Sequence, residues 1–295
     1  MNSIDIESKK FLGQPKNFVS IFNALLFDGK QVLKPEYLKD ENSELVMNVS
    51  SKHVDIIKRY EDGTYLDLFV IESQSYVDPS MVARVMEYES VARMRYIRQN
   101  FKKHVPMHTR LPMILTVVLY VGESKWNAAK RLSELEIIHP GFEDMFNEFK
   151  LNLIELNTNH KYNTGEKATQ DFFDLLRMIY RKQILKEDLD REFNRDALYF
   201  AYVVAKNKEL LNIYQESEKG DVKVCRALDE MFEESTNKGI QMGIKQGIEQ
   251  GIEQGIALNQ FEVYQTMLDK GFSVKDIASI FSVSEKSIKK LLMKA

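Results

Sequence analysis

Cysteine, long apolar runs and an excess of either charge are all scarce in this chain. The single cysteine, Cys225, excludes an internal disulfide and a thiolate metal cage, so we expect a reducing compartment. No apolar run approaches the ~18 residues of a membrane span, and the amino-terminal residues lack the basic-then-apolar pattern of an export signal. With 41 basic against 44 acidic residues, a formal net charge of -3 excludes a generally polycationic coat for nucleic acids. We therefore expect a cytoplasmic protein without a membrane partner.

The composition that remains is ordinary for a globular protein, with 44% hydrophobic and 29% charged residues in 295. Helical periodicity covers 16–27 and the segment after Asp78-Pro79, where Asp78 is the expected N-cap and Pro79 the first helical residue. From 169 to 234 the pattern is helical with no strand candidate. Short β-branched and aromatic runs predict the strands 44–49, 53–60, 65–76, 112–122 and 151–156. This order predicts the α/β class, with a C-terminal helical extension.

A repeat separates two further regions. Gly-Ile recurs every four residues from Gly239 to Ile256, and 261–295 returns to globular composition. The later part reads as helix, turn, helix, with Ser273 and Ser284 as N-caps. We predict four regions, which are a core (1–165), a helical annex (166–236), the Gly-Ile repeat (237–258) and a helix-turn-helix-like tail (259–295).

Two carboxylates stand on a predicted hairpin. Asp62-Gly63 between alternating runs predicts a two-residue turn, in which Glu61 faces Thr64 and Asp55 faces Val70. Glu72 and Gln74 then share the face of Asp55, and the diagonal Asp55–Glu72 α-carbon distance is about 7–8 Å. Two carboxylates at that spacing can share one divalent cation.

Other interpretations of this stretch stay open. In one of them the strand simply reaches solvent at Glu72 and Gln74, which end an apolar column. His53 lies opposite Glu72 in the same register, either as a third ligand or as a structural histidine.

The residues around this hairpin resemble a known family. Asp55, the run Ile71-Glu72-Ser73-Gln74-Ser75, Asp78-Pro79-Ser80-Met81 and Arg84 are similar to the PD-(D/E)XK nuclease superfamily. Leu111-Pro112, Leu119 to Glu123, Trp126 and the Gly-Ile repeat resemble its Rpn-type branch of recombination-promoting nucleases and transposases. The resemblance implies a restriction-endonuclease-like fold, in which helices flank a mixed sheet. It also implies that the protein cleaves double-stranded DNA with Mg²⁺, or with Mn²⁺ as a substitute.

The resemblance also implies roles for single residues. Asp55 and Glu72 would ligate the metal, and Gln74 takes the place where the superfamily usually has lysine. A glutamine can hold a water by hydrogen bonds but cannot act as a base. Some members carry an acidic ligand on the first core helix, whereas 16–27 has none, and Glu44 is the nearest candidate.

Basic residues are candidates for DNA contact. Arg84 could meet a phosphate or could be an ordinary exposed helix arginine, and the same alternative holds for the basic half of its helix, which carries Arg93, Arg95, Arg98, Lys102 and Lys103. The tail from Gly271 has five lysines against two acids, so its second helix could bind DNA or only pack. The candidates on that helix are Lys286, Ser287, Lys289 and Lys290.

The repeat predicts either a homo-oligomer or a flexible linker. Five helical glycines are unfavourable by roughly 5 kcal/mol relative to alanine, so a helix here needs close packing against a partner. The function that we predict is a metal-dependent DNA endonuclease associated with recombination or transposition. The alternatives are a DNA-binding mobile-element protein without catalysis and an oligomeric scaffold built on the repeat.

Overall fold

The computed structural model describes residues 3–41, 56–63, 66–217 and 220–293. The chain divides into two compact units, Met1–Asp229 and Glu230–Ala295. Within the described residues, no helix is both long enough and apolar enough to cross a membrane.

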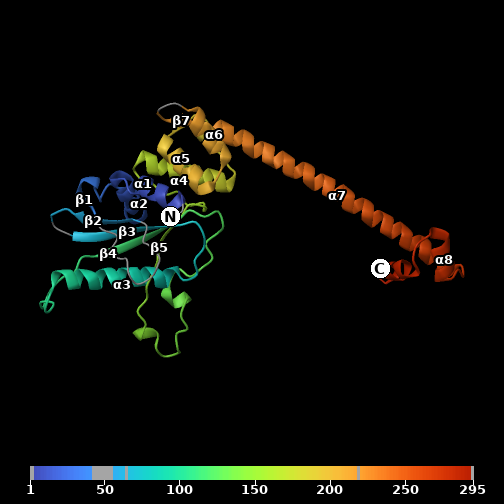
Figure 1. Ribbon diagram of the computed structural model, residues 1–295, viewed down its shortest axis with the longest axis horizontal. Helices are drawn as coiled ribbons and strands as arrows, with labels where there is room; N and C mark the ends of the chain where they lie inside the picture. Colours follow the sequence, from blue (N-terminus) through green and yellow to red (C-terminus); the bar gives the residue numbers. More distant parts are fainter. Residues whose placement is uncertain (1–2, 42–55, 64–65, 218–219, 294–295) are drawn as a thin grey trace. The chain divides into compact units, whose positions relative to one another are not determined.

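A five-stranded mixed sheet forms the centre of the first unit (Figure 1). The strands stand in chain order, antiparallel from β1 to β3 and parallel from β3 to β5. Their bounds are β1 (Leu38–Asp40), β2 (Ile56–Glu61), β3 (Leu66–Gln74), β4 (Ile114–Tyr120) and β5 (Asn152–Glu155). The mixed α/β class is confirmed, as is the helical C-terminal region that the sequence predicts.

Helices cover both faces of this sheet (Figure 1). On one face, Val70 of β3 belongs to an apolar cluster with Tyr88 of α3 (Met81–Asn100). On the other face, Phe22 of α2 (Pro15–Phe27) packs on Phe69, with ring centroids 4.8 Å apart. Burial on both faces explains why β4 and the middle of β3, from Leu68 to Ile71, are almost continuously apolar.

The remaining helices of this unit pack against one another through aromatic rings. Phe11 of the first helix contacts Phe172 and Phe200, with ring centroids 5.6 and 5.0 Å apart. These helices are α1 (Ser3–Leu12), α4 (Lys167–Arg181), α5 (Arg195–Ala205) and α6 (Lys208–Glu216). Short 3-10 turns lie at Pro35–Tyr37, Leu132–Glu134, Glu143–Met145 and Lys186–Asp188.

The hairpin register differs from the predicted one by two residues. Glu61 pairs with Leu66 rather than Thr64, and Val70 pairs with Ile57 rather than Asp55. Gly63 has the positive φ of +89° that the Asp-Gly signal requires, but the loop is longer than two residues. Because side chains alternate with a period of two, this shift keeps every residue on its predicted face.

Two further expectations need correction, and two elements come without a prediction. The α3 helix begins at Met81 with Ser80 at the N-cap, and Asp78 instead accepts hydrogen bonds from Ser80. The stretch 169–234 is not helical throughout, since β6 (Glu192–Phe193) and β7 (Val222–Lys223) pair there. The sequence predicts neither β1, which has only three residues, nor α1, whose Phe11 finds its aromatic partners far along the chain.

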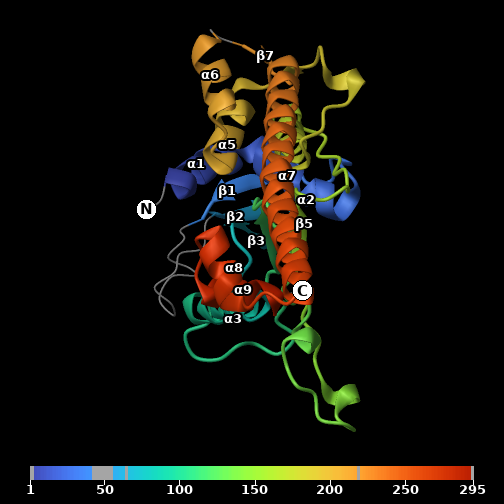
Figure 2. The ribbon, with the colours of Figure 1, turned by 90° about the vertical axis from the view of Figure 1, so that its right-hand side faces the viewer.

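The second unit is helical. The α7 helix (Cys225–Asp269) contains the whole Gly-Ile repeat, and α8 (Val274–Phe281) and α9 (Glu285–Leu292) follow it. Ile277 of α8 and Ile288 of α9 pack with Tyr264 of α7. In Figure 2, α8 and α9 lie beside the C-terminal end of α7. Ser273 and Ser284 cap α8 and α9 through their side chains, as predicted.

Candidate active site

Glu72 and Gln74 lie at the C-terminal end of β3, in the middle of the sheet. Glu72 exposes 2% of its surface and Gln74 exposes 6%, so the strand does not emerge into solvent at these residues. Alternation along β3 places them on the face of Val70, which α3 covers. An acidic and an amide side chain are thus buried where the apolar column of β3 ends.

Among the described residues, Gln74 and Arg84 donate hydrogen bonds to the Glu72 carboxylate. Its Oε1 accepts one hydrogen bond from Gln74 Nε2 and one from Arg84 Nη2, both at 2.9 Å. Arg84 belongs to the first turn of α3, so the strand and the next helix meet at this carboxylate. A buried carboxylate requires such a counter-charge because loss of water disfavours its ionised form.

Arg84 has two further partners on its own side of the site. Nη1 donates to Asp78 Oδ2 at 2.5 Å, whereas Nε and Nη2 donate to the Tyr88 hydroxyl oxygen at 3.1 and 2.8 Å. Asp78 Oδ1 accepts from the Ser80 backbone N–H at 2.9 Å and from its hydroxyl at 2.6 Å. The guanidinium is therefore shared between two carboxylates, and only 13% of the Arg84 side chain is exposed.

The charge states follow from these contacts. Burial opposes ionisation of Asp78, but hydrogen bonds from Ser80 and Arg84 outweigh it and lower the pKa of Asp78 below its ordinary value. Burial likewise opposes the charge on Arg84, yet hydrogen bonds to Asp78 and Tyr88 raise its pKa. Burial and the nearby Glu72 raise the pKa of the Tyr88 phenol. At neutral pH, Asp78 and Arg84 are charged and Tyr88 is neutral.

Asp55, His53 and Glu44 lie outside the described residues. The residue after Asp55, Ile56, pairs with Ile71, the residue before Glu72. In the part of the chain that the structure describes, no three or more His, Cys, Asp or Glu side chains gather as a metal cluster.

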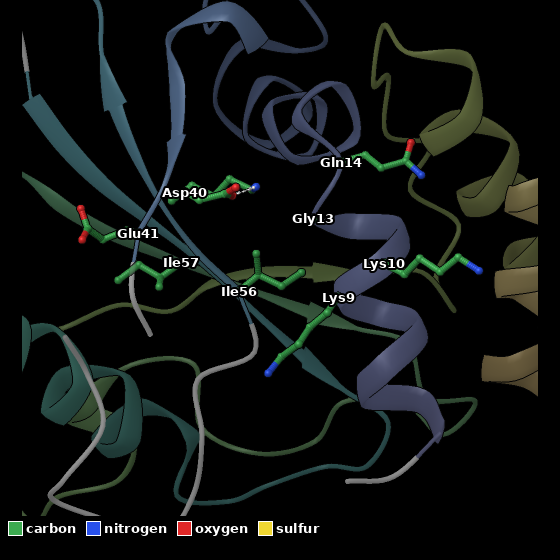
Figure 3. A pocket seen from close by; sticks show the side chains of 9 residues that line it. Lys9, Lys10, Gly13, Gln14, Asp40, Glu41, Ile56 and Ile57 are labelled. Carbon is green, nitrogen blue, oxygen red and sulfur yellow. Dashed lines mark hydrogen bonds and ion pairs between the residues drawn. The ribbon is translucent and has the colours of Figure 1, made fainter. Parts of the chain in front are cut away.

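A pocket of about 420 Å³ opens at the N-terminal end of β2, where Ile56, Ile57 and Lys58 line it (Figure 3). In it, Lys58 Nζ donates to Asp40 Oδ1 at 2.6 Å, and Lys9 extends from α1 below Ile56. Glu72 and Gln74 are not among its lining residues, which are Lys9, Lys10, Gly13, Gln14, Asp40, Glu41, Ile56, Ile57 and Lys58. The pocket is thus a neighbouring feature and not part of the carboxylate site.

The remaining candidates do not join this cluster. Lys286, Ser287, Lys289 and Lys290 are exposed on α9 in the second unit, where the Ser287 hydroxyl is 2.8 Å from that of Ser284. In the basic half of α3, Arg93 pairs with the buried Glu89 at 2.8 Å, whereas Arg98 is exposed.

The sequence alone does not predict that Asp78 and Tyr88 bind Arg84 at this site. The sequence predicts a helix cap at Asp78 and no role for Tyr88. A signal was present, since Arg84 and Tyr88 are four residues apart and residues at that spacing lie on one helix face. Only the packing of α3 on β3 shows that this face meets Glu72.

Comparison with known proteins identifies the family. Residues 9–210, about two thirds of the chain, match the model of the family described as "Putative transposase, YhgA-like". No curated protein and no solved structure matches the chain. The matched segment contains β1 to β5 and the cluster of Glu72, Gln74, Asp78, Arg84 and Tyr88. The chain therefore belongs to the family of YhgA-like putative transposases.

Proposed function

We propose that the chain is a metal-dependent DNA endonuclease whose site is built around Glu72. The observation that carries this proposal is the burial of the Glu72 carboxylate at the end of the central strand, between Gln74 and Arg84. Buried ionisable groups with a specific charged partner are candidates for a functional site. Membership of a transposase family supports DNA as the partner.

The chemistry of the site suits a hard divalent cation. Mg²⁺ prefers oxygen ligands and is commonly held by one or two carboxylates. Glu72 supplies one carboxylate, and we assign Asp55 as the second, with Mn²⁺ as a possible substitute for Mg²⁺. Such an ion, when bound, lowers the pKa of a bound water and offsets negative charge that develops on a phosphate.

Side chains of the protein would position the reactants. Gln74 is within hydrogen-bond distance of Glu72, so its amide can hold a water beside that carboxylate. It supplies no positive charge, so phosphate neutralisation falls to Arg84 and to a bound cation. Arg84 suits this task because its planar fork matches phosphate oxygens.

We further propose that α9 contacts DNA. Its lysines at 286, 289 and 290 are exposed, and among the residues that the structure describes none of them pairs with an acidic side chain, whereas Ile288 on the opposite side is fully buried. The helix can therefore present a basic face while its apolar face packs on α8 and α7. Lysine–phosphate contacts would bring duplex DNA to the protein without specifying its sequence.

The Gly-Ile repeat supports self-association. Five isoleucines of the repeat keep 54–58% of their surface exposed, and a Cβ added at any of its five glycines meets no atom within 4 Å. Fully burying one isoleucine stabilises by roughly 1.5–3 kcal/mol, so burying the exposed half of five gives about 4–8 kcal/mol per chain. The five glycines are unfavourable by about 5 kcal/mol in total. The helix therefore gains from a partner about what its glycines lose, and a second copy of the repeat has matching ridges and gaps.

The test is cleavage of supercoiled plasmid in Mg²⁺ or Mn²⁺ by wild type, Glu72→Gln and Glu89→Gln. Glu89 is a matched control because it is also a buried glutamate (5% exposed) with an arginine partner. We expect Glu72→Gln to lose cleavage and Glu89→Gln to keep it, although Glu89→Gln weakens an acceptor for Thr116 N. If Glu72→Gln nicks DNA as fast as wild type, the metal site is wrongly assigned. Binding without cleavage by wild type would favour the non-catalytic DNA-binding alternative.

A further inference from the structure

Arg84 is anchored more firmly on its helix side than on Glu72. Asp78 and Tyr88 accept three of its hydrogen bonds, and Ser80 fixes Asp78 through two more. In the part of the chain that the structure describes, Glu72 accepts one hydrogen bond from Arg84, on an oxygen that also accepts one from Gln74. Loss of the Glu72 contact would therefore leave the guanidinium held near the site.

The Glu72 oxygen cannot serve two cations equally well. Arg84 Nη2 lies 2.9 Å from Oε1, and a Mg²⁺ ligand oxygen lies about 2.0–2.1 Å from the ion. The ion and the guanidinium would then be close like charges in a buried site, where screening is weak. Binding of a divalent cation at Glu72 should therefore weaken the Arg84–Glu72 pair.

If Arg84 is displaced from Glu72, the hydrogen-bond donor that now binds Glu72 becomes available to another anion. The guanidinium forms paired hydrogen bonds to carboxylates and phosphates with similar geometry. Asp78 alone would then neutralise it, and a DNA phosphate at the site would replace the anion that the cation has taken.

We infer that Arg84 is a transferable cation, which neutralises Glu72 in the ligand-free chain and passes to a DNA phosphate when a divalent cation occupies Glu72. This inference rests on the proposed function. It makes Arg84 a positioning residue that couples cation binding to DNA binding. By linkage, each ligand raises the affinity of the other by the same factor.

The experiment measures this coupling without cleavage. Fluorescence anisotropy gives the Kd of a short labelled duplex with and without Ca²⁺, at one fixed ionic strength, for wild type, Arg84→Gln and Arg93→Gln. Calorimetry with Mn²⁺ alone gives the cation affinity of the same proteins and of Glu72→Gln. Arg93 is the matched control because it lies on the same helix and pairs with a buried glutamate.

We expect Ca²⁺ to tighten duplex binding at least fivefold in wild type and in Arg93→Gln, and less than twofold in Arg84→Gln, since allosteric couplings are typically about 5–150-fold. Arg84→Gln alone should bind Mn²⁺ at least fivefold more tightly, because the competing charge is gone. Equal coupling in wild type and Arg84→Gln overturns the inference. Mn²⁺ affinity that Glu72→Gln leaves unchanged overturns the proposed metal site instead.

A second variant covers loss of folding. If circular dichroism shows that Arg84→Gln is unfolded, Arg84→Lys keeps the charge but lacks the planar fork for a phosphate. Coupling should then fall at least threefold below wild type, and coupling equal to wild type overturns the inference.

Discussion

Replacing two glycines of the repeat by alanine gives opposite results for a lone helix and for a packed one. Gly247 and Gly251 lie in the middle of the repeat, and an added Cβ at either position meets no atom within 4 Å in the single chain. Alanine is favoured over glycine in a helix by about 1 kcal/mol per residue. If α7 has no partner, the double substitution should therefore stabilise the helix by about 2 kcal/mol.

The opposite sign is expected if the repeat packs against a second copy. Each glycine then admits the partner's backbone or an isoleucine ridge, and an added methyl group meets that partner. Overpacking of a well-packed contact is unfavourable by roughly 1–3 kcal/mol. A net loss of about 2 kcal/mol in association corresponds to a dissociation constant about 30-fold higher.

Light scattering over a range of concentrations gives the mass and the dissociation constant, and thermal melting of helical circular dichroism gives the stability. The matched control is Glu249→Ala with Glu253→Ala. Each lies two residues after a glycine, which is about 200° around the helix. We expect the control to associate like wild type and the glycine variant to dissociate. A glycine variant that is more stable and has unchanged mass would refute glycine-mediated packing, and a monomeric wild type would leave the repeat as a linker.

Three further outcomes are expected. Asp55→Ala should abolish plasmid cleavage as Glu72→Ala does, and Gln74→Ala should reduce it less, because the amide only positions; equal loss for all three would contradict the division of roles. Changing Lys286, Lys289 and Lys290 to glutamine should weaken duplex affinity and flatten its dependence on salt, because fewer counterions are released on binding; an unchanged salt slope would favour a tail that only packs. Cys225 is fully buried, and burial, with the nearby charge of Asp188, raises the pKa of its thiol to about 12. An ordinary cysteine has a pKa of about 8.5, so alkylation at pH 8–9 should be fast only in the unfolded chain, and rapid labelling of the native chain would contradict this burial.

Local chemistry decided the features that the sequence predicted well. Ser273 and Ser284 begin α8 and α9 because a serine side chain can bond the N–H groups of the first turn, whatever lies further away. The alternation along β3 likewise placed Glu72, Gln74 and Val70 on one face, because the period of two belongs to the strand itself. The predicted family also came from sequence motifs, which are those around this strand, those from Leu111 to Trp126 and the Gly-Ile repeat.

Tertiary packing alone decided the pairing of the strands and the partners at the site. A two-residue shift of the hairpin leaves every side chain on its face, so the apolar pattern could not distinguish the register of Ile57 with Val70 from the predicted one. The helix α1 depends on Phe11, whose aromatic partners lie more than 150 residues further along the chain. The packing of α3 on β3 likewise brings Arg84 to the buried Glu72 carboxylate. Asp78 and Tyr88 bind the same guanidinium, and so they belong to the site only in the folded chain. Contacts between distant segments leave no local signal in the sequence, and so only the folded chain reveals them.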